Sequence, residues 1–233
     1  VNINKDSITL IGKDSNATVV DPPGAKTLAG LYGIYADTQT GLRVRNLGAT
    51  GARAGINLVN VDLSTLTSDS VGACGEYGIY AANSDTVSVD GCQASANSGG
   101  GYVYGIYFTG GSSDTIDNTL ANSNTTSGSG QYAYGICLKS TSRSVVRNSS
   151  ARENVGGFGG SPVGIGIGLD GSSNNEIRNN TANGNTSGAT VGIGIQLSNG
   201  SFQNTIDGNR FETNVRYGIN AANSDSNIFT NNL

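Results

Sequence analysis

A two-residue unit, Gly-Ile, recurs along the chain and opens stretches in which apolar and polar positions alternate. The first and third residues past the Gly are apolar, as in Ile106 and Phe108, whereas Tyr107 between them points to the other face. A period of two is typical of a β-strand with one buried face. The unit occurs at Gly33, Gly55, Gly78, Gly105, Gly135, Gly166, Gly194 and Gly218.

A second aliphatic residue follows each Gly at a spacing close to eleven positions. Every repeat therefore carries two strand anchors. The segments between the anchors are rich in Gly, Asn and Ser, which favour turns over helices. The second anchors are Val44, Leu66, Val89, Ile116, Val146, Ile177, Ile206 and Ile228.

An asparagine stands eight residues after the second anchor in five consecutive repeats. Two of these segments, written from the anchor onward, are VRNSSAREN and IRNNTANGN. In stacked coils, an Asn in the same turn of each coil can hold a left-handed backbone and donate its amide to the next copy. We therefore predict an asparagine ladder of Asn97, Asn124, Asn154, Asn185 and Asn214.

Repeats of roughly 22 to 31 residues, with two or three short strands and polar turns, indicate a parallel solenoid. The chain lacks both the Leu-x-x-Leu-x-Leu rhythm of leucine-rich repeats and the strict six-residue period of left-handed hexapeptide helices. Crossovers between parallel strands are usually right-handed. The predicted fold is therefore all-β, a single-stranded right-handed parallel β-helix of about eight to nine coils.

This β-helix is expected to form a single domain over residues 1–233, with residues 1–30 as the first coil and 31–233 as the Gly-Ile repeats. No polar capping segment follows the last repeat. Because an open solenoid end exposes core and strand edges, we expect additional domains or a homotrimer to cover the C-terminal end.

Composition narrows the possible partners. The chain has 36 Gly among 233 residues, and its net charge is −4 without a cluster of Lys or Arg, which argues against nucleic acid. No stretch resembles a leader or a membrane span, so no membrane insertion is expected. The odd number of Cys and the lack of a CxxC motif predict free thiols at Cys74, Cys92 and Cys137.

The repeats YGIYAANSDTVSV, YGIYFTGGSSDTI and GIGLDGSSNNEIRNNTANGN resemble those of the pectate-lyase-like superfamily, above all the NosD-like, carbohydrate-binding and sugar-hydrolase repeat modules. The resemblance covers the chain from about Leu31 onward. It implies a parallel β-helix that binds an extended polysaccharide along the outside of one sheet, in a secreted or cell-surface protein.

The variation in repeat length is confined to one turn. The segment between the second anchor and the next Gly is longest in the middle four repeats, at residues 98–103, 125–133, 155–162 and 186–190. These Gly- and Ser-rich insertions are expected to stack as a ridge beside the first sheet. One-sided insertions in repeat folds often mark the working face, although neutral insertions also accumulate where a turn tolerates them.

The outward positions of the Gly-Ile strands are the candidate substrate-binding residues. Aromatic rings among amides and hydroxyls suit sugars, which have apolar faces and polar edges. The alternative is that Tyr is there as a good exposed strand former that stacks on its neighbours. The candidates are Tyr80, Tyr107, Thr109 and Gln196.

Lys139 and Asp170 are the candidate catalytic pair, because they occupy equivalent outward positions on adjacent coils. A lyase or an epimerase needs a base and a cation beside the substrate carboxylate. The alternative is a surface ion pair. Asp37 and Asp170 are too far apart for a hydrolase on this sheet, and the absence of His excludes His-dependent epimerase chemistry.

Asp90 and Asp117 are the candidate metal ligands, since they lie one residue past the second anchor on adjacent coils. Stacked carboxylates repel each other unless a cation or an Arg compensates. Calcium is the candidate ion for this pair, and no other cofactor is indicated. The alternative is a charge ladder that keeps the second sheet soluble.

Three functional hypotheses follow. The first is an extracellular polysaccharide-binding β-helix, with lyase, epimerase or glycoside hydrolase activity on an extended glycan as its enzymatic form. The alternative is a structural or adhesive shaft, such as a phage tailspike or cell-surface fibre segment without catalytic activity. The third is an enzyme fragment whose catalytic loops lie outside these residues.

Overall fold

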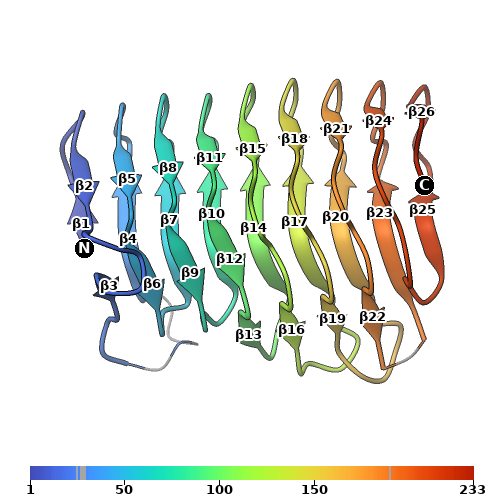
Figure 1. Ribbon diagram of the computed structural model, residues 1–233, viewed down its shortest axis with the longest axis horizontal. Helices are drawn as coiled ribbons and strands as arrows, with labels where there is room; N and C mark the ends of the chain where they lie inside the picture. Colours follow the sequence, from blue (N-terminus) through green and yellow to red (C-terminus); the bar gives the residue numbers. More distant parts are fainter. Residues whose placement is uncertain (25, 27–29, 189) are drawn as a thin grey trace.

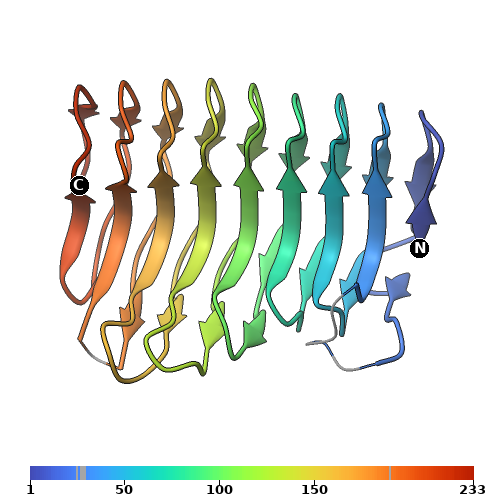
Figure 2. The same cartoon turned by 180° about the vertical axis from the view of Figure 1, so that it is seen from behind.

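The computed structural model describes residues 1–24, 26, 30–188 and 190–233, and it shows strands stacked side by side along one long axis (Figures 1 and 2). No α-helix occurs among these residues, and every strand pair is parallel. The predicted parallel β-helix is therefore confirmed.

Two nine-stranded sheets run from the first coil to the last. The first sheet contains the Gly-Ile strands: β1 (Asn2–Ile3), β4 (Tyr32–Asp37), β7 (Ala54–Val59), β10 (Tyr77–Ala82), β14 (Val103–Thr109), β17 (Ala133–Lys139), β20 (Gly164–Asp170), β23 (Gly192–Ser198) and β25 (Tyr217–Ala221). The second sheet contains the second anchors: β2 (Thr9–Ile11), β5 (Arg43–Arg45), β8 (Thr65–Thr67), β11 (Ser88–Asp90), β15 (Thr115–Asp117), β18 (Val145–Arg147), β21 (Glu176–Arg178), β24 (Thr205–Asp207) and β26 (Ile228–Thr230).

Two four-stranded sheets complete the coils. The third sheet belongs to the N-terminal coils: β3 (Val19–Val20), β6 (Gly48–Thr50), β9 (Ser70–Gly72) and β12 (Gln93–Ser95). The fourth sheet lies in the long insertions: β13 (Ser98–Gly99), β16 (Thr125–Thr126), β19 (Val155–Gly156) and β22 (Thr186–Ser187). These short strands lie side by side at the lower edge of Figure 1, so the insertions stack as the sequence predicts.

The core is a column of aliphatic side chains between the two long sheets. The Ile of the Gly-Ile unit is at most 1% exposed in the first seven copies, and the second anchors from Val44 to Ile206 are equally buried. The last second anchor was wrongly assigned to Ile228. Ile206 pairs with Phe229, so Phe229 holds the anchor position by register, although Phe229 is 41% exposed and Ile228 56% exposed.

The Gly of the Gly-Ile unit is required by close packing inside the coil. The hydrogen-bonded ladder between β10 and β14 pairs Tyr77 with Tyr104 and Ile79 with Ile106, but it contains no pair for the Gly between them. The ladder is thus irregular at each of these glycines. A Cβ on Gly105 would lie 2.7 Å from Asn124 Nδ2 and 2.6 Å from the Ala94 carbonyl oxygen. Because this irregularity turns both the Gly and the Ile inward, the residue before the Gly and the residue after the Ile both face outward.

The asparagine ladder is present. Each side-chain amide donates to the amide oxygen of the next coil, at 2.8 Å from Asn97 to Asn124 and at 3.0 Å for the following three steps. One detail of the prediction was wrong, because the left-handed backbone belongs to the residue before each ladder asparagine. These residues are Ala96, Ser123, Glu153, Gly184 and Thr213.

Candidate functional site

Seven tyrosines gather on the outer side of the first sheet, and we call them the tyrosine surface: Tyr32, Tyr35, Tyr77, Tyr80, Tyr104, Tyr107 and Tyr134. They occupy the two positions that the Gly-Ile irregularity turns outward. All seven are half-buried. The surface extends over five neighbouring strands, from β4 to β17.

The rings of the tyrosine surface stack on one another. Tyr104 lies between Tyr77 and Tyr134, with ring centroids 5.5 and 5.0 Å apart, and it stacks on Tyr107 of its own strand at 4.4 Å. Tyr80 lies 5.6 Å from Tyr107. Burial raises the pKa of Tyr107 to about 12, so the hydroxyl keeps its proton at neutral pH. The surface is thus aromatic, uncharged and ordered by ring packing.

A gap interrupts the tyrosine surface at β7. This strand carries Ala54 and Asn57 at the positions where β4 and β10 carry tyrosines. The result is a cavity of about 270 Å³, which we call the slot, with Asn57 of β7 between the flanking tyrosine pairs. Its lining is Tyr32, Tyr35, Arg53, Asn57, Val59, Tyr77 and Tyr80.

The polar groups of the slot are few. Asn57 is 5% exposed, and its side-chain oxygen has no hydrogen-bond partner among the described residues. Arg53 forms an ion pair with Glu76. The slot therefore combines aromatic walls, one unpaired amide oxygen and a neutralised charge pair.

The predicted residues on the first sheet are only partly brought together. Tyr80 and Tyr107 are neighbours, and Thr109 pairs with Lys139 at the ends of their strands. Gln196 is separate, because it pairs with Gly168 on the far side of Tyr134, whose ring covers that glycine. The four predicted substrate-binding residues therefore do not form one cluster.

Lys139 and Asp170 lie side by side, with Lys139 Nζ 3.5 Å from Asp170 Oδ2. Asp170 also accepts a hydrogen bond from Asn199 of the next coil. The lysine side chain is 50% exposed and the aspartate side chain 27%. A catalytic role for this exposed ion pair stays a prediction.

Asp90 and Asp117 pair in register on the second sheet. Asp117 accepts a hydrogen bond at 2.7 Å from Arg147 and another from Asn148, and Asp90 accepts one from Asn118. Although burial acts to raise the pKa of Asp117, these hydrogen bonds lower it below its ordinary value. In the described ranges, no three His, Cys, Asp or Glu side chains could together hold a metal ion. Calcium at this pair stays a prediction.

The insertions cover part of the first sheet beside the tyrosine surface. Ile165 and Ile193 occupy outward positions, yet they are 0% and 2% exposed. They pack in a small apolar cluster with Val163, Tyr132 and Tyr134. The ridge thus closes the surface at its C-terminal side and leaves the tyrosines of β4 and β10, and β7 between them, outside this cover.

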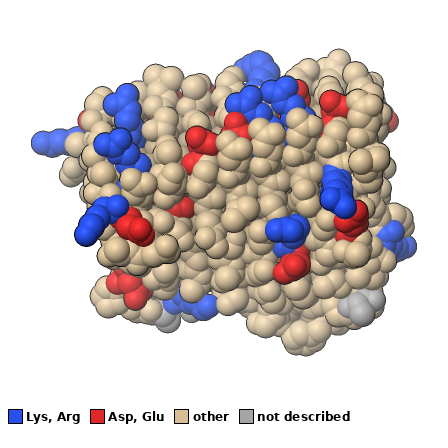
Figure 3. Space-filling model, viewed as in Figure 1, with Lys and Arg blue, Asp and Glu red and all other residues tan. Residues whose placement is uncertain are grey.

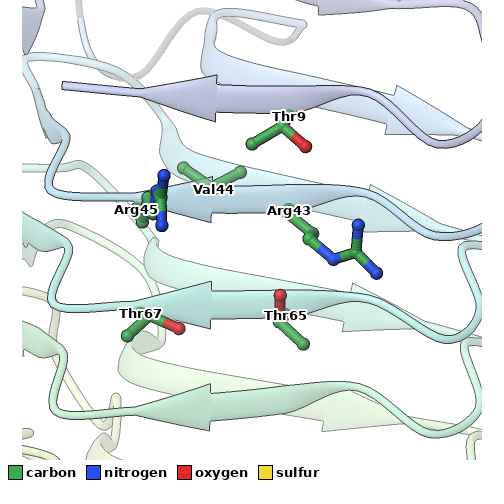
Figure 4. A pocket seen from close by; sticks show the side chains of 6 residues that line it. All are labelled: Thr9, Arg43, Val44, Arg45, Thr65 and Thr67. Atoms are coloured by element: carbon green, nitrogen blue, oxygen red, sulfur yellow. The ribbon is translucent and has the colours of Figure 1, made fainter.

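A second cavity lies on the second sheet. Figure 4 shows Arg43 and Arg45 on one strand, Thr9 on the strand to one side, and Thr65 and Thr67 on the strand to the other. Elsewhere, charges are dispersed: on the face in Figure 3, basic and acidic side chains are interspersed and wide areas carry none.

The described residues include no helix long and apolar enough to cross a membrane.

Sequence reasoning missed the slot. It identified the outward tyrosines but did not use the break in their column. The signal is present in the repeat alignment, because Ala54 and Asn57 stand where Tyr32 and Tyr35 stand one coil earlier. A gap becomes a cavity only when both neighbouring coils keep their rings.

Comparisons with known proteins agree on the fold. A family model described as "Periplasmic copper-binding protein (NosD)" matches residues 26–233. No curated protein matches the sequence. Similar solved structures include ORF18 of Geobacillus virus E2, with 16% identity, a TM-score of 0.59, and coverage of 100% of this chain and 51% of that chain.

Two other similar structures are enzymes by name. DFA-IIIase from Arthrobacter chlorophenolicus A6, without its lid, has 13% identity and a TM-score of 0.54, with coverage of 95% of this chain and 60% of that chain. The A-module of mannuronan C-5 epimerase AlgE4 from Azotobacter vinelandii has 14% identity and a TM-score of 0.51, with coverage of 98% and 79%. At these identities the likeness shows the fold alone. The chain spans about half of the phage protein and three fifths of DFA-IIIase.

Proposed function

The chain belongs to the NosD family, and from this membership and the tyrosine surface we propose that it is a polysaccharide-binding protein that works outside the cytoplasm. The glycan lies along the outer side of the first sheet, across the strands from β4 to β17. The family description names the periplasm. Secretion or display at the cell surface is the more specific form of this proposal.

The single observation that carries the proposal is the stacked, uncharged tyrosine surface. Sugar rings present apolar C–H faces that pack on aromatic rings, and their hydroxyl edges need nearby amides and hydroxyls. Tyr80, Tyr107 and Asn57 supply both kinds of group within neighbouring coils. Because the rings already pack on one another, little side-chain freedom is lost when a ligand binds.

The names of two structural neighbours support the same ligand class. The Azotobacter protein is named for mannuronan, which is a polysaccharide, and DFA-IIIase is described in complex with GF2 and with DFA-III. These ligands belong to those proteins. Their relevance here is that the outside of such a β-helix offers a long surface on which several sugar units can bind in a row.

Copper, which the family description names, does not fit the residues of this chain. Copper sites use Cys, Met and His side chains, and the chain has no His and no Met. The three cysteines are buried, and burial raises the pKa of Cys74 to about 11, that of Cys92 to about 12 and that of Cys137 well above its ordinary value. All three thiols therefore keep their protons, and we assign no copper-dependent step.

Catalysis by Lys139 and Asp170 is a separate proposal with its own test. A lyase that removes the proton beside a uronate carboxylate releases unsaturated products, which absorb ultraviolet light. Incubation with a panel of uronate polymers should show this absorbance if the pair is catalytic, and Lys139→Ala should abolish it. Binding at the tyrosine surface does not depend on the result.

The proposed function is tested on a glycan array with wild type, Tyr107→Ala and Tyr107→Phe. Wild type should bind neutral polysaccharides, Tyr107→Ala should lose binding, and Tyr107→Phe should largely keep it because the ring remains. Thermal melts of the three proteins separate loss of binding from loss of fold. Absence of binding to every neutral and acidic glycan by folded wild type would overturn the proposal.

A further inference from the structure

We propose that the slot at Asn57 is a subsite for one neutral pyranose ring, which packs between the tyrosine pair of β4 and the tyrosine pair of β10. The inference rests on the proposed function and deepens it, since it places one sugar unit and states its chemistry. The sugar hydroxyls contact Asn57 at the floor of the slot. The rest of the glycan continues over Tyr107 and Tyr104.

The slot is wide enough for one sugar ring. β4 and β10 are two strand spacings apart, which is about 9.6 Å. A ring in van der Waals contact with a group on each side needs about 7 to 8 Å. A ring fits at this spacing in the adjacent column of the same surface, because Tyr104, which is in register with Ala54 and not with Asn57, lies between Tyr77 and Tyr134. The slot therefore has room for one six-membered ring where β7 lacks its own tyrosine.

An unpaired amide lies at the floor of the slot. Asn57 is only 5% exposed, and its Oδ1 has no hydrogen-bond partner among the described residues. A buried polar atom without a partner destabilises the empty protein. Because the oxygen is shielded from solvent in the empty slot, the side chain rotates to present the amide to a sugar hydroxyl, which can donate to the oxygen or accept from the amide nitrogen. The position points outward, since it pairs in register with Tyr35 and Tyr80.

The charge of the slot favours a neutral sugar. Arg53 at the edge of the slot is already paired with Glu76, so none of the described lining residues offers a free cation to an acidic sugar. Val59 adds an apolar contact at the other end of β7. The volume of about 270 Å³ is close to the lower end of the range of about 300–1,000 Å³ for small-ligand sites. A neutral pyranose fits this chemistry better than a uronate.

The test uses Asn57→Tyr, which fills the slot with the residue that β4 and β10 carry at the same position. The variant extends the ring stack, so its melting temperature should equal or exceed that of wild type. Tyr35→Ala removes one wall. Tyr217→Ala is the matched control, because Tyr217 is an exposed tyrosine of β25 outside the tyrosine surface.

Binding is measured by calorimetry with gluco-, xylo- and manno-hexaoses as probes. For the hexaose that wild type binds, Asn57→Tyr and Tyr35→Ala should each weaken affinity at least tenfold, and Tyr217→Ala should change it less than twofold. If Asn57→Tyr binds as tightly as wild type or more tightly, the tyrosines form a continuous platform and the slot proposal is wrong, while the proposed function stands. If wild type binds none of the hexaoses and no glycan on the array, both proposals are wrong.

Discussion

In four repeats, the Gly of the Gly-Ile unit packs directly against the side-chain amide of a ladder asparagine. The absent Cβ of Gly78 leaves room for the Asn97 amide nitrogen, which an added Cβ would approach to 2.8 Å. Gly135 has the same relation to Asn154. The two most regular features of the sequence are therefore neighbours in space, and each explains why the other repeats.

Gly105→Ala should destabilise the protein by roughly 1–3 kcal/mol, because the new methyl group overpacks a closed interior. Its Cβ would lie within 2.7 Å of backbone and side-chain atoms on three sides. Gly100→Ala is the matched control, since nothing lies within 4 Å of a Cβ there. Urea denaturation of both variants checks the difference. Equal stability of the two would show that the coil relaxes around the methyl group.

Two buried aspartates occupy corner positions where later coils carry uncharged side chains, Cys, Thr, Ser and Asn for Asp69 and Ser and Asn for Asp114. Burial raises the pKa of Asp69 to about 6 and that of Asp114 to about 7. Each accepts a backbone hydrogen bond from the preceding coil, as Asn175 does from Ser144. A carboxyl oxygen can accept the backbone hydrogen bond at these corners, but burial disfavours the ionised form of the carboxyl group.

Asp114→Asn should stabilise the protein above pH 7 by roughly 2–4 kcal/mol and have little effect at pH 4. Below about pH 4 the carboxyl is protonated in the folded and the unfolded chain. Between pH 4 and 7 only the unfolded chain ionises, so the free energy of unfolding of wild type falls as pH rises. Denaturation at pH 4, 6 and 8 measures this.

Asp90→Asn, a change at an exposed aspartate, is the control for Asp114→Asn and should alter stability by less than about 0.5 kcal/mol at each pH. A gain for Asp114→Asn that is the same at pH 4 and pH 8 would mean that amide hydrogen bonding, and not ionisation, is the cause.

At the scale of the element, the turns are built from repeated corner hydrogen bonds. Besides the predicted ladder, Asn175 donates to Asn204, which donates to Asn227, and a third ladder runs through Asn180, Asn209 and Asn232. Side-chain oxygens at these corners accept backbone N–H groups of the preceding coil. The backbone N–H groups of these buried turns thereby have hydrogen-bond acceptors without helices or sheet pairing.

The strands were predictable from the sequence because a period of two with one buried face leaves a direct trace in residue types. The turn backbone was less predictable: Ala96 and Glu153 hold left-handed conformations that their residue types do not favour. Phe229 was missed as an anchor because Ile228 beside it is also apolar. The slot was missed because it depends on rings from β4 and β10, which lie far apart in the sequence.

Asn154→Ala should destabilise the protein by roughly 2–4 kcal/mol, since it removes the acceptor for two buried N–H donors of Asn124 and the donor to Asn185. Asn16→Ala, at an exposed position in the first coil, is the control. Thermal denaturation followed by circular dichroism compares them. A loss no larger than that of the control would show that the ladder adds order but little stability.

At the scale of the whole molecule, the tyrosine surface and the insertions that cover the first sheet occupy different parts of the long axis. The tyrosine surface belongs to the strands from β4 to β17, whereas the insertions cover the outward Ile165 and Ile193 of β20 and β23. The tyrosine surface thus extends over about four strand spacings, or about 19 Å. A glycan bound there meets rings and amides along its length, while the arginines of the cavity in Figure 4 lie on the other long sheet.

This separation predicts that glycan affinity is almost independent of salt. Attraction between exposed charges is screened within about 10 Å at 0.1 M salt and within about 3 Å at 1 M, whereas ring packing and neutral hydrogen bonds are not. The dissociation constant for the bound hexaose should therefore change less than twofold between 50 mM and 500 mM sodium chloride. Calorimetry checks this, with Arg43→Ala as the control that leaves the tyrosine surface intact. A steep loss of affinity with salt that Arg43→Ala abolishes would move the glycan to the second sheet, because only a charged contact there responds to both changes.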